Sequence, residues 1–529
     1  MANAKITSRL HSVILGAIIT CGLAPGVSRV LGQSTKDNKA SKPATEQYRP
    51  TYHFTPINTW TNDPNGLFYK NGVYHLYYQN NPFDNVWGHM SWGHAISKDL
   101  VHWKHLPVAI AEVNKPDTTI SIFSGSAVID LENSSQFGKT GKAPIVAIFT
   151  GDLPKQKKQA QYVAYSNDNG GSFKFYSGDP VIDINRPDFR DPNVFWYAPG
   201  KEWIMAVSLV HEHKIRFYGS KDLKKWEILS DFGPSGYTGH DWECPALMPI
   251  AVDENPANTK WVLLVSSWGP KGPSMQYFVG GFDGKNFHND NTNDQVLTVD
   301  FGDCFYAAIP WRLNQNKPLL LGWLVPGKVD VNPWRGQMSI PRDLSLHITD
   351  SGIRLFQRPA KLIQEKLTTF SHGDKSSLKS LEVKSQSVNP FKNKIKPGNS
   401  FWLEATIDVK GAKTAGFNIA ADSQNNHKVV VGYDSEQQAL FVDCSAAKLQ
   451  YKDSANKILT APLKAQDGKV KIQILMDNSS LEVFGNDGEK VITTMVYPDA
   501  TEKALSLFSN GKSTFQNLSI WDLREASNK

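Results

Sequence analysis

Short apolar runs alternate with polar and turn-forming residues along most of the chain. Examples are Tyr74–Tyr78, Ile145–Phe149 and Trp261–Val265, with Gly, Pro, Asn or Asp close to each run. Runs of this length and spacing are typical of β-strands, and no long stretch with a helical period of 3.6 residues interrupts them. The pattern therefore predicts an all-β protein.

One segment of this pattern recurs. Ser97–Leu106 and Ser220–Leu229 agree at six of ten positions, including Ser-Lys-Asp-Leu and a Trp, and residues 166–173 and 281–287 resemble them more weakly. The aromatic anchors of the four segments are 70, 53 and 61 residues apart, at Trp103, Phe173, Trp226 and Phe287. A fifth unit of this length would end near residue 350. Repeats of about 60 residues with several short strands each favour propeller blades, and two coincidental hairpin turns are the alternative.

The pattern changes after residue 350. Thirteen of the 15 tryptophans precede this point, and residues 373–400 are rich in Lys and Ser. Alternating strands then follow at 401–408, 428–432, 469–475, 481–484 and 505–508. Such spacing predicts a β-sandwich. The sequence thus predicts a five-bladed β-propeller over residues 48–350, followed by a junction and a C-terminal β-sandwich over residues 351–529.

The N-terminus resembles a secretory signal. Lys5 and Arg9 precede the apolar stretch Val13–Ala24, and small residues follow. We expect a signal peptide over residues 1–32, a flexible lead-in over residues 33–47, and a secreted or periplasmic location. No run of 18 apolar residues follows position 33, so no membrane span is expected in the mature chain.

Composition limits the classes of function that the protein can have. The chain has 529 residues, of which 40% are hydrophobic and 11% aromatic, enough for a large core, which excludes general disorder. Without Lys5, Arg9 and Arg29 the formal charge falls from +6 to +3. So small an excess gives no indication of nucleic-acid binding.

Cysteine and histidine spacing gives no metal signature. Cys244, Cys304 and Cys444 remain after the signal peptide, too far apart for a zinc site or a disulfide scaffold. His211-Glu-His213 would place two histidines on one face of a strand, but no third ligand motif accompanies them. We expect no metal and no cofactor.

Three short motifs carry carboxylates. Asp63 lies in Trp-Thr-Asn-Asp-Pro-Asn-Gly, Asp191 in Phe-Arg-Asp-Pro and Glu243 in Trp-Glu-Cys-Pro. Taken alone, each has a structural explanation. Asp-Pro-Asn-Gly is a strong turn sequence, Arg190-Asp191 fits an ion pair, and Glu243 fits a residue on an edge strand. However, they precede the anchors of their blades by 40, 35 and 44 residues, a similar phase in each repeat. The first strand of a propeller blade lines the central channel, so the three side chains are expected at one mouth of it. Phe123–Ser126 and Leu321–Trp323 fit the same inner position in the second and fifth blades.

Clustered carboxylates among aromatic rings suit the cleavage of glycosidic bonds. One carboxylate attacks the anomeric carbon or activates water, and a protonated one donates to the leaving oxygen. Like charges held close move the two pKa values apart, which assigns the two roles.

At these motifs the chain resembles glycoside hydrolase family 32, the β-fructofuranosidases that include invertases, exo-inulinases and levanases. The motifs occur in the family's order, together with Gly322-Trp323, Trp334-Arg-Gly and Pro341-Arg-Asp-Leu344. Asp477–Phe484 is similar to the family's signature in the sandwich domain. The resemblance covers residues 48–527 and implies the same propeller and sandwich.

The resemblance also implies residue roles. Asp63 would be the nucleophile of a retaining reaction, Glu243 the general acid/base, and Asp191 would hold fructose hydroxyls and stabilise the oxocarbenium-like transition state. Independently of the resemblance, the positive charge of Arg190, the preceding residue, is expected to keep Asp191 ionised. A carboxyl separation of about 5–5.5 Å is expected for this route. The expected fructosyl pocket also contains Asn62, Gln79, Trp87, Phe123, Ser124, Arg190 and Trp323.

Two positions depart from the family. Thr61 stands where Met is frequent, and an ungapped match puts Cys304 in place of the usual acidic residue. Asp303 beside it is expected to take over this role, in which relatives position the sugar beyond the cleaved fructose. Cys244, next to Glu243, is expected to be a packing residue.

The sequence thus predicts an exo-β-fructosidase that releases fructose from fructan or fructo-oligosaccharide ends, with sucrose a further candidate substrate. A fructosyltransferase with the same pocket, in which a sugar intercepts the intermediate, is the first alternative. A fructan-binding protein without turnover is the second, and an inverting arabinan hydrolase a remoter one. The β-2,6 or β-2,1 preference and the oligomeric state are not determined by the sequence.

Overall fold

The computed structural model describes residues 46–529 except 140, 271, 314–317, 330, 371–374, 392–397, 448–456, 525 and 527–529. The expected signal peptide, and the lead-in up to residue 45, lie outside the described residues. The regular structure of the described part consists of β-strands, apart from one α-helix, α1 (Lys361–Phe370), and two short 3₁₀ helices. The all-β expectation is therefore confirmed.

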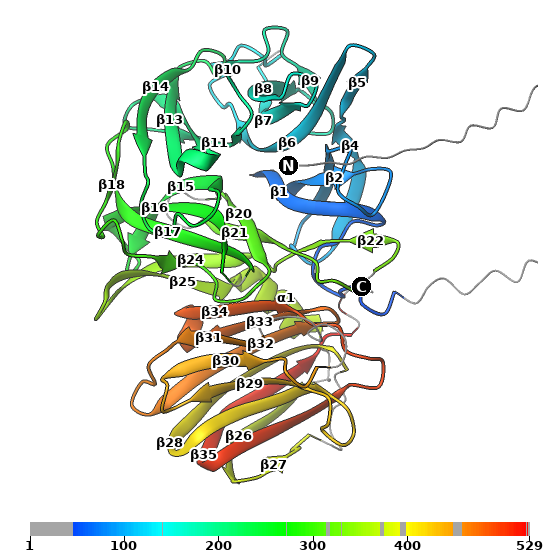
Figure 1. Ribbon diagram of the computed structural model, residues 1–529. Coiled ribbons are helices and arrows are strands. Elements are labelled where there is room, and N and C mark those ends of the chain that lie inside the picture. The colour runs from blue at the N-terminus through cyan, green and yellow to red at the C-terminus, as the bar shows by residue number, and fades with distance from the viewer. Residues whose placement is uncertain are drawn as a thin grey trace, which may run out of the picture. The chain divides into compact units, whose positions relative to one another are not determined.

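The first three blades are antiparallel sheets that follow one another along the chain (Figure 1). Blade 1 contains β1 (Thr59–Lys70), β2 (Val73–Asn81), β3 (Ser91–Ser97) and β4 (Trp103–Ile110), with the short β22 (Trp334–Arg335) parallel to β1. Blade 2 contains β5 (Val113–Lys115), β6 (Thr118–Ile129), β7 (Ile145–Leu153), β8 (Lys158–Ser166), β9 (Lys174–Phe175) and β10 (Ile182–Arg186). Blade 3 contains β11 (Phe189–Tyr197), β12 (Glu202–Leu209), β13 (Lys214–Ser220) and β14 (Glu227–Phe232).

The last two blades share one sheet, because β15 pairs with β24. Blade 4 contains β15 (Glu243–Val252), β16 (Asn255–Gly269), β17 (Gly272–Phe282), β18 (Phe287–Asn289) and β19 (Leu297–Thr298). Blade 5 contains β20 (Phe305–Trp311), β21 (Leu319–Leu324), β23 (Gln337–Met338), β24 (Arg342–Thr349) and β25 (Gly352–Pro359). These five blades confirm the expected five-bladed propeller.

The recurring Ser-Lys-Asp-Leu segment forms the same turn twice. Ser97 Oγ accepts a hydrogen bond from the backbone N–H of Leu100, and Ser220 Oγ accepts one from Leu223. Both leucines have a positive φ, 67° and 60°, and are buried. The two segments are therefore equivalent units of the repeat and not coincidental turns.

Every inner strand carries a bulge at the same place. The strand registers shift between Thr61 and Pro64 in β1, between Ile122 and Gly125 in β6, and between Arg190 and Asn193 in β11. In β15 the shift lies between 243 and 246, and in β20 between 306 and 309. A bulge re-aims the side chains of its strand. Predicted site residues of the first four blades lie in or beside these bulges.

Two sequence expectations are wrong in detail. The inner strand of the fifth blade is β20, and Leu321–Trp323 lies on β21, the second strand. The His-Glu-His segment is not a strand, because Val210–Glu212 is a short 3₁₀ helix, η1, and His213 has a φ of 52°. His211 contacts Asp188 and Asp241 at 2.9 and 2.8 Å.

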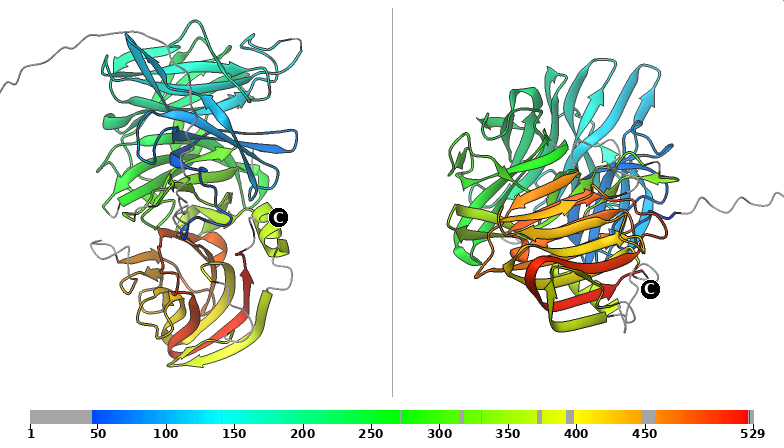
Figure 2. Two further views of the ribbon diagram at one scale, coloured as in Figure 1. Left: turned by 90° about the vertical axis from the view of Figure 1, so that its right-hand side faces the viewer. Right: turned by 60° about the horizontal axis from the view of Figure 1, so that its bottom comes forward.

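The second domain is a sandwich of two sheets connected by two long strands. One layer contains β29 (Val429–Asp434), β30 (Ala439–Asp443), β31 (Ile458–Pro462) and β27 (Ser387–Val388). The other contains β32 (Lys469–Asp477), β33 (Ser480–Gly485), β34 (Lys490–Met495) and β26 (Lys375–Lys384), with the 3₁₀ helix η2 (Asn486–Gly488) before β34. The long strands β28 (Ser400–Ala421) and β35 (Ala504–Asp522) pair with both layers (Figure 2).

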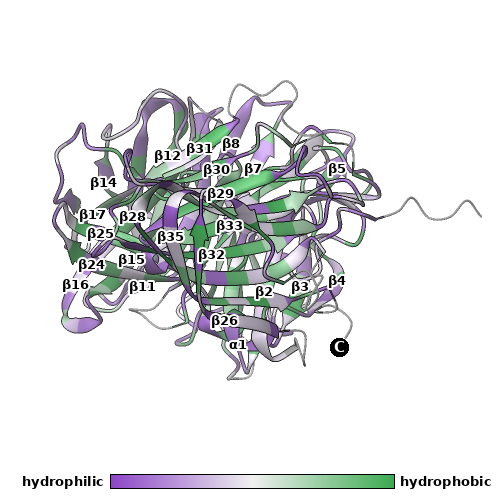
Figure 3. Cartoon of the chain, turned by 90° about the horizontal axis from the view of Figure 1, so that it is seen from below, coloured by the Kyte–Doolittle hydropathy of each residue, from purple (hydrophilic) through white to green (hydrophobic). Residues whose placement is uncertain are grey.

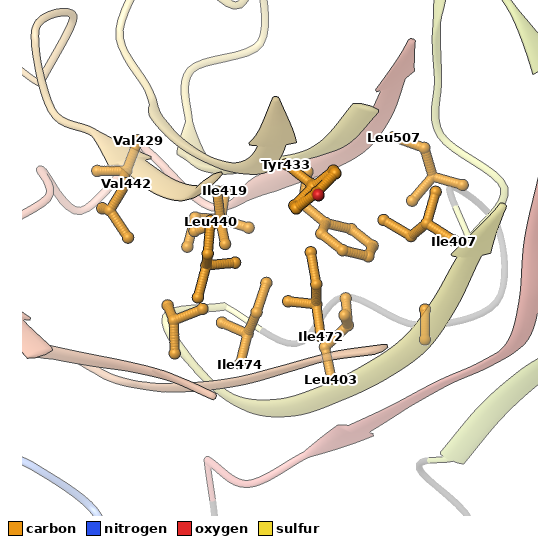
Figure 4. Close-up of a cluster of buried hydrophobic side chains, with 14 of the residues drawn as sticks. Leu403, Ile407, Ile419, Val429, Tyr433, Leu440, Val442, Ile472, Ile474 and Leu507 are labelled. Carbon is orange, nitrogen blue, oxygen red and sulfur yellow. The ribbon is translucent and has the colours of Figure 1, made fainter. Parts of the chain in front are cut away.

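The sandwich core lies between these layers. Leu403, Ile472 and Ile474 of one layer face Tyr433 and Leu440 of the other, and all are buried (Figure 4). Hydrophobic stretches follow the central strands and hydrophilic ones the outer loops (Figure 3). The predicted C-terminal β-sandwich is thus confirmed, whereas its boundary near residue 350 stays a prediction.

Candidate functional site

The three predicted carboxylates meet around one cysteine. Cys244 Sγ lies 3.7 Å from Asp63 Oδ2 and 3.5 Å from Asp191 Oδ2, and the Cys244 backbone N–H donates to Asp191 Oδ2 at 2.9 Å. Glu243 is the residue before Cys244. Asp191 and Cys244 have φ values of 68° and 48°, so both bulges use a backbone conformation that is rare outside glycine. The structure therefore brings together residues that are up to 180 positions apart.

Asp63 is held by two neighbours. Ser124 Oγ of β6 donates to Asp63 Oδ2 at 2.5 Å, and Asn62 Nδ2 donates to Oδ1 at 3.2 Å. Trp60 Nε1 in turn donates to the Asn62 side-chain oxygen at 2.8 Å. Burial raises the pKa of Asp63 and the negative charge of Glu243 adds to this, whereas the hydrogen bonds from Ser124 and Asn62 oppose it.

Glu243 is bound on both of its oxygens. Arg190 donates to Oε1 from Nε at 3.0 Å and from Nη2 at 2.9 Å, and the Tyr306 hydroxyl donates to Oε2 at 2.7 Å. Arg190 also donates to Asp188 at 3.2 Å. The arginine that we expected to serve Asp191 thus donates hydrogen bonds to Glu243 and Asp188.

Asp191 is buried, and both positive and negative side chains surround it. Burial raises its pKa, the positive charge of Arg190 lowers it, and the negative charges of Glu243 and Asp63 raise it again. The net pKa is raised, so Arg190 does not by itself keep this carboxyl ionised. The Asp191 backbone N–H is fixed by Thr150 Oγ1 at 3.0 Å.

The other predicted pocket residues divide into two groups. Asn62, Ser124 and Arg190 bond directly to the catalytic candidates, and Trp323 packs beside Cys244 and Tyr306. Trp323 also makes an edge contact with Trp60, with ring centroids 6.0 Å apart.

Three predicted residues lie around this centre without bonding to the carboxylates. Trp87 is 59% exposed and contacts Phe123 edge-on, with ring centroids 6.1 Å apart. Gln79 is buried and donates to the backbone oxygen of Ile122 at 3.0 Å. Trp87 and Phe123 are placed to form an aromatic wall, and Gln79 fixes the strand next to it.

Asp303 and Cys304 both contact the sandwich domain. The Asp303 backbone N–H and the Cys304 thiol both contact the backbone oxygen of Thr493 on β34, at 3.1 and 3.5 Å. Burial raises the pKa of Asp303 to about 6. Among the described residues, no hydrogen bond connects Asp303 with the three carboxylates. The cysteine at the usually acidic position is buried against the sandwich strand.

Sequence reasoning missed Tyr306. It lies in the inner strand β20 and belongs to the segment Asp-Phe-Gly-Asp-Cys-Phe-Tyr-Ala, whose acidic residues are the more obvious candidates. Its position at the start of the fifth bulge, matching Glu243 in the fourth, is the signal that could have identified it. The contacts of Cys244 were also underestimated, because it bridges two carboxylates as well as packing.

The described residues contain neither a metal-binding cluster nor a membrane-spanning helix. No group of three or more His, Cys, Asp or Glu side chains in this part of the chain is arranged to hold a metal ion. No helix in the same part is long and apolar enough to cross a membrane.

Comparison with known proteins agrees with this geometry. The family description "Glycosyl hydrolases family 32 N-terminal domain" matches residues 53–359, and "Glycosyl hydrolases family 32 C terminal" matches residues 365–522. The chain belongs to glycoside hydrolase family 32. Among other members of family 32, it is 42% identical over 498 residues to a levanase of Bacillus subtilis (strain 168), covering 91% of this chain and 71% of the levanase. It is 36% identical over 508 residues to an extracellular exo-inulinase of Aspergillus awamori, covering 89% of this chain and 93% of the exo-inulinase.

Solved structures of family 32 members share the fold. The exo-inulinase from Aspergillus awamori superposes with a TM-score of 0.83 at 34% identity, covering 90% of this chain and 99% of that one. A fructofuranosidase from Schwanniomyces occidentalis complexed with fructosylnystose gives a TM-score of 0.82 at 30% identity, covering 91% of this chain and 99% of the fructofuranosidase. This chain is thus a glycoside hydrolase of the family of levanases, exo-inulinases and invertases.

Proposed function

We propose that the protein is a secreted, retaining exo-β-fructosidase that releases fructose from the non-reducing ends of fructans, levan or inulin. Asp63 is the nucleophile, Glu243 the acid/base, and Asp191 binds fructose hydroxyls. The observation that carries this proposal is the meeting of all three carboxylates around Cys244, with Ser124 orienting Asp63 and with Arg190 and Tyr306 orienting Glu243.

The hydrogen bonds suit a double displacement. In the first step an Asp63 oxygen forms a bond to the anomeric carbon while the glycosidic oxygen leaves with the proton of Glu243. Arg190 and Tyr306 stabilise the Glu243 carboxylate that remains. In the second step this carboxylate takes a proton from water, the water oxygen attacks the anomeric carbon, and Asp63 is released. Glu243 is then protonated for the next cycle.

A narrow space lies between the inner strands next to the carboxylates. Its volume is about 10 Å³, and it is bordered by Pro64, Ser124, Asp191, Cys244 and Ile309 among others. This space holds about one water molecule.

Substitution of the two carboxylates tests the proposal. Asp63→Asn and Glu243→Gln keep the side-chain shape and are each expected to lower kcat for fructose release by about 10⁴-fold or more. Asp294→Asn and Glu382→Gln are matched controls, since both native side chains are exposed, and they should keep normal turnover. Folding is checked by thermal unfolding. Turnover within tenfold of the native protein in a folded Asp63→Asn or Glu243→Gln variant would refute the assignment.

Product analysis tests the finer points. Early products of hydrolysis, followed by NMR, should show fructose released with retained β-configuration. Chromatography should show free fructose and not longer chains, which separates a hydrolase from a fructosyltransferase. Parallel rates on levan, inulin and sucrose give the linkage preference.

A further inference from the structure

The central channel of the propeller opens into a second cavity at the end away from the carboxylates. The site residues lie in the first halves of the inner strands, whereas this cavity is lined by the second halves, such as Leu67–Tyr69 of β1, Ser126–Ile129 of β6 and Asn193–Tyr197 of β11. Its volume is about 550 Å³, within the range of small-molecule sites. The narrow space of about 10 Å³ lies between the two ends.

Arg312, which follows β20, contributes a charge to this cavity. Its Nη2 donates to the side-chain oxygen of Asn193 at 2.7 Å and to the backbone oxygen of Leu247 at 2.9 Å. Its guanidinium carbon lies 5.0 Å from the ring centroid of Phe195. These contacts hold the guanidinium in one orientation. Nε and Nη1 donate no hydrogen bond within the described part of the chain, so their N–H groups remain for a ligand.

No carboxylate of a described residue balances this charge. Arg312 forms no ion pair with a described residue and is the only charged side chain among the described residues that line the cavity. Burial lowers the pKa of Arg312 to about 10. A buried charge without a counter-ion is unfavourable, in contrast to Arg190 and Arg342, which have carboxylate partners.

The walls of the cavity are apolar and aromatic. Trp196, Trp261 and Tyr197 line it beside aliphatic and proline residues, and Trp196 is 41% exposed. An inorganic anion would bond to the arginine but leave these walls in water. A ligand with both a charge and an apolar body would cover both features.

We propose that this cavity binds a small organic carboxylate with an aromatic or apolar body, its carboxylate paired with Arg312 and its body against Trp196 and Trp261. The planar fork of a guanidinium matches a carboxylate, and flat rings pack well on tryptophan. This site is separate from the fructosyl pocket and does not depend on the proposed function.

Calorimetric titration of the full chain tests the site with defined probes. 2-Naphthoate is expected to bind one site per chain in the millimolar range or tighter, and the neutral 2-naphthamide at least tenfold more weakly. Saturating fructose should leave the naphthoate affinity unchanged. Equal affinity for the acid and the amide, displacement by fructose, or no binding of naphthoate at 10 mM would each overturn the proposal.

Two variants locate the site. Arg312→Met keeps the length of the side chain and should weaken naphthoate binding at least tenfold, while Arg358→Met, which changes an exposed arginine on β25, should leave it unchanged. Trp196→Ala, at the exposed rim, should weaken binding severalfold and serves as the decisive variant if Arg312→Met does not fold. Native affinity in folded Arg312→Met, or in Trp196→Ala, would refute the assignment.

Discussion

A buried group of charges connects the propeller with the sandwich. His53, which precedes β1, donates from Nδ1 to Asp477 at 2.8 Å and contacts Glu482 from Nε2 at 2.9 Å. Glu482 also accepts hydrogen bonds from Arg342 of β24, at 2.5 and 3.0 Å. The four side chains have no solvent exposure. Removing the charge on His53 therefore leaves two sandwich carboxylates with less compensation.

The pH dependence of stability follows from this arrangement. Burial alone would lower the pKa of His53, but the hydrogen bonds and charges of Asp477 and Glu482 raise it to about 9, from 6.5 in an unfolded chain. Because the folded value is the higher one, protonated His53 stabilises the fold fully below about pH 6.5. This contribution is lost as the pH rises from 6.5 to 9, and it amounts to about 3 kcal/mol.

Urea unfolding followed by tryptophan fluorescence measures this contribution at pH 6, 7, 8 and 9. The native protein should lose about 3 kcal/mol of unfolding free energy across the series. His53→Gln should be less stable at pH 6 and should lack this loss, while His288→Gln, at an exposed position, should behave as the native protein does. If His53→Gln shows the same pH dependence as the native protein, the reasoning is refuted.

Three further predictions concern single features. Tyr306→Phe removes the hydroxyl that donates to Glu243 and should lower kcat by about 10- to 100-fold with little change in KM, as steady-state kinetics on a fructan would show. Gly125→Ala would place its new Cβ 2.2 Å from the backbone oxygen of Ile148, so urea unfolding should show a loss of about 1–3 kcal/mol or more. N-terminal sequencing of the secreted protein should begin close to Gln33, and a start at Met1 would contradict the signal peptide.

The architecture was predictable because repeats and alternation are local signals. The Ser-Lys-Asp-Leu turns revealed the blades, and the phase of Asp63, Asp191 and Glu243 within them predicted that the three meet. The inner strand of the fifth blade was harder to identify, because at its bulge β20 carries Tyr306 and not a carboxylate. Phase alone therefore put Trp323 on the inner strand, where the structure has β20.

Contacts between distant segments were beyond sequence reasoning. The resemblance identified the motif that contains Glu482, but its bonds to His53 and Arg342 span 429 and 140 residues. Likewise Cys304 could be recognised as unusual, but only the structure shows that it faces Thr493 of the sandwich. The partner of Arg190 depends on side-chain direction, which adjacency to Asp191 in the sequence does not give.

The most direct test of the account is the identity of the residue that bonds to fructose during turnover. Glu243→Ala should still react with β-fructosyl fluoride, whose leaving group needs no acid, but should release fructose slowly for lack of a base. Mass spectrometry of peptides from the quenched reaction should then find one fructosyl group on the peptide that contains Asp63. A fructosyl group on the Asp191 peptide, or steady hydrolysis of the fluoride with inverted configuration and no labelled peptide, would contradict it.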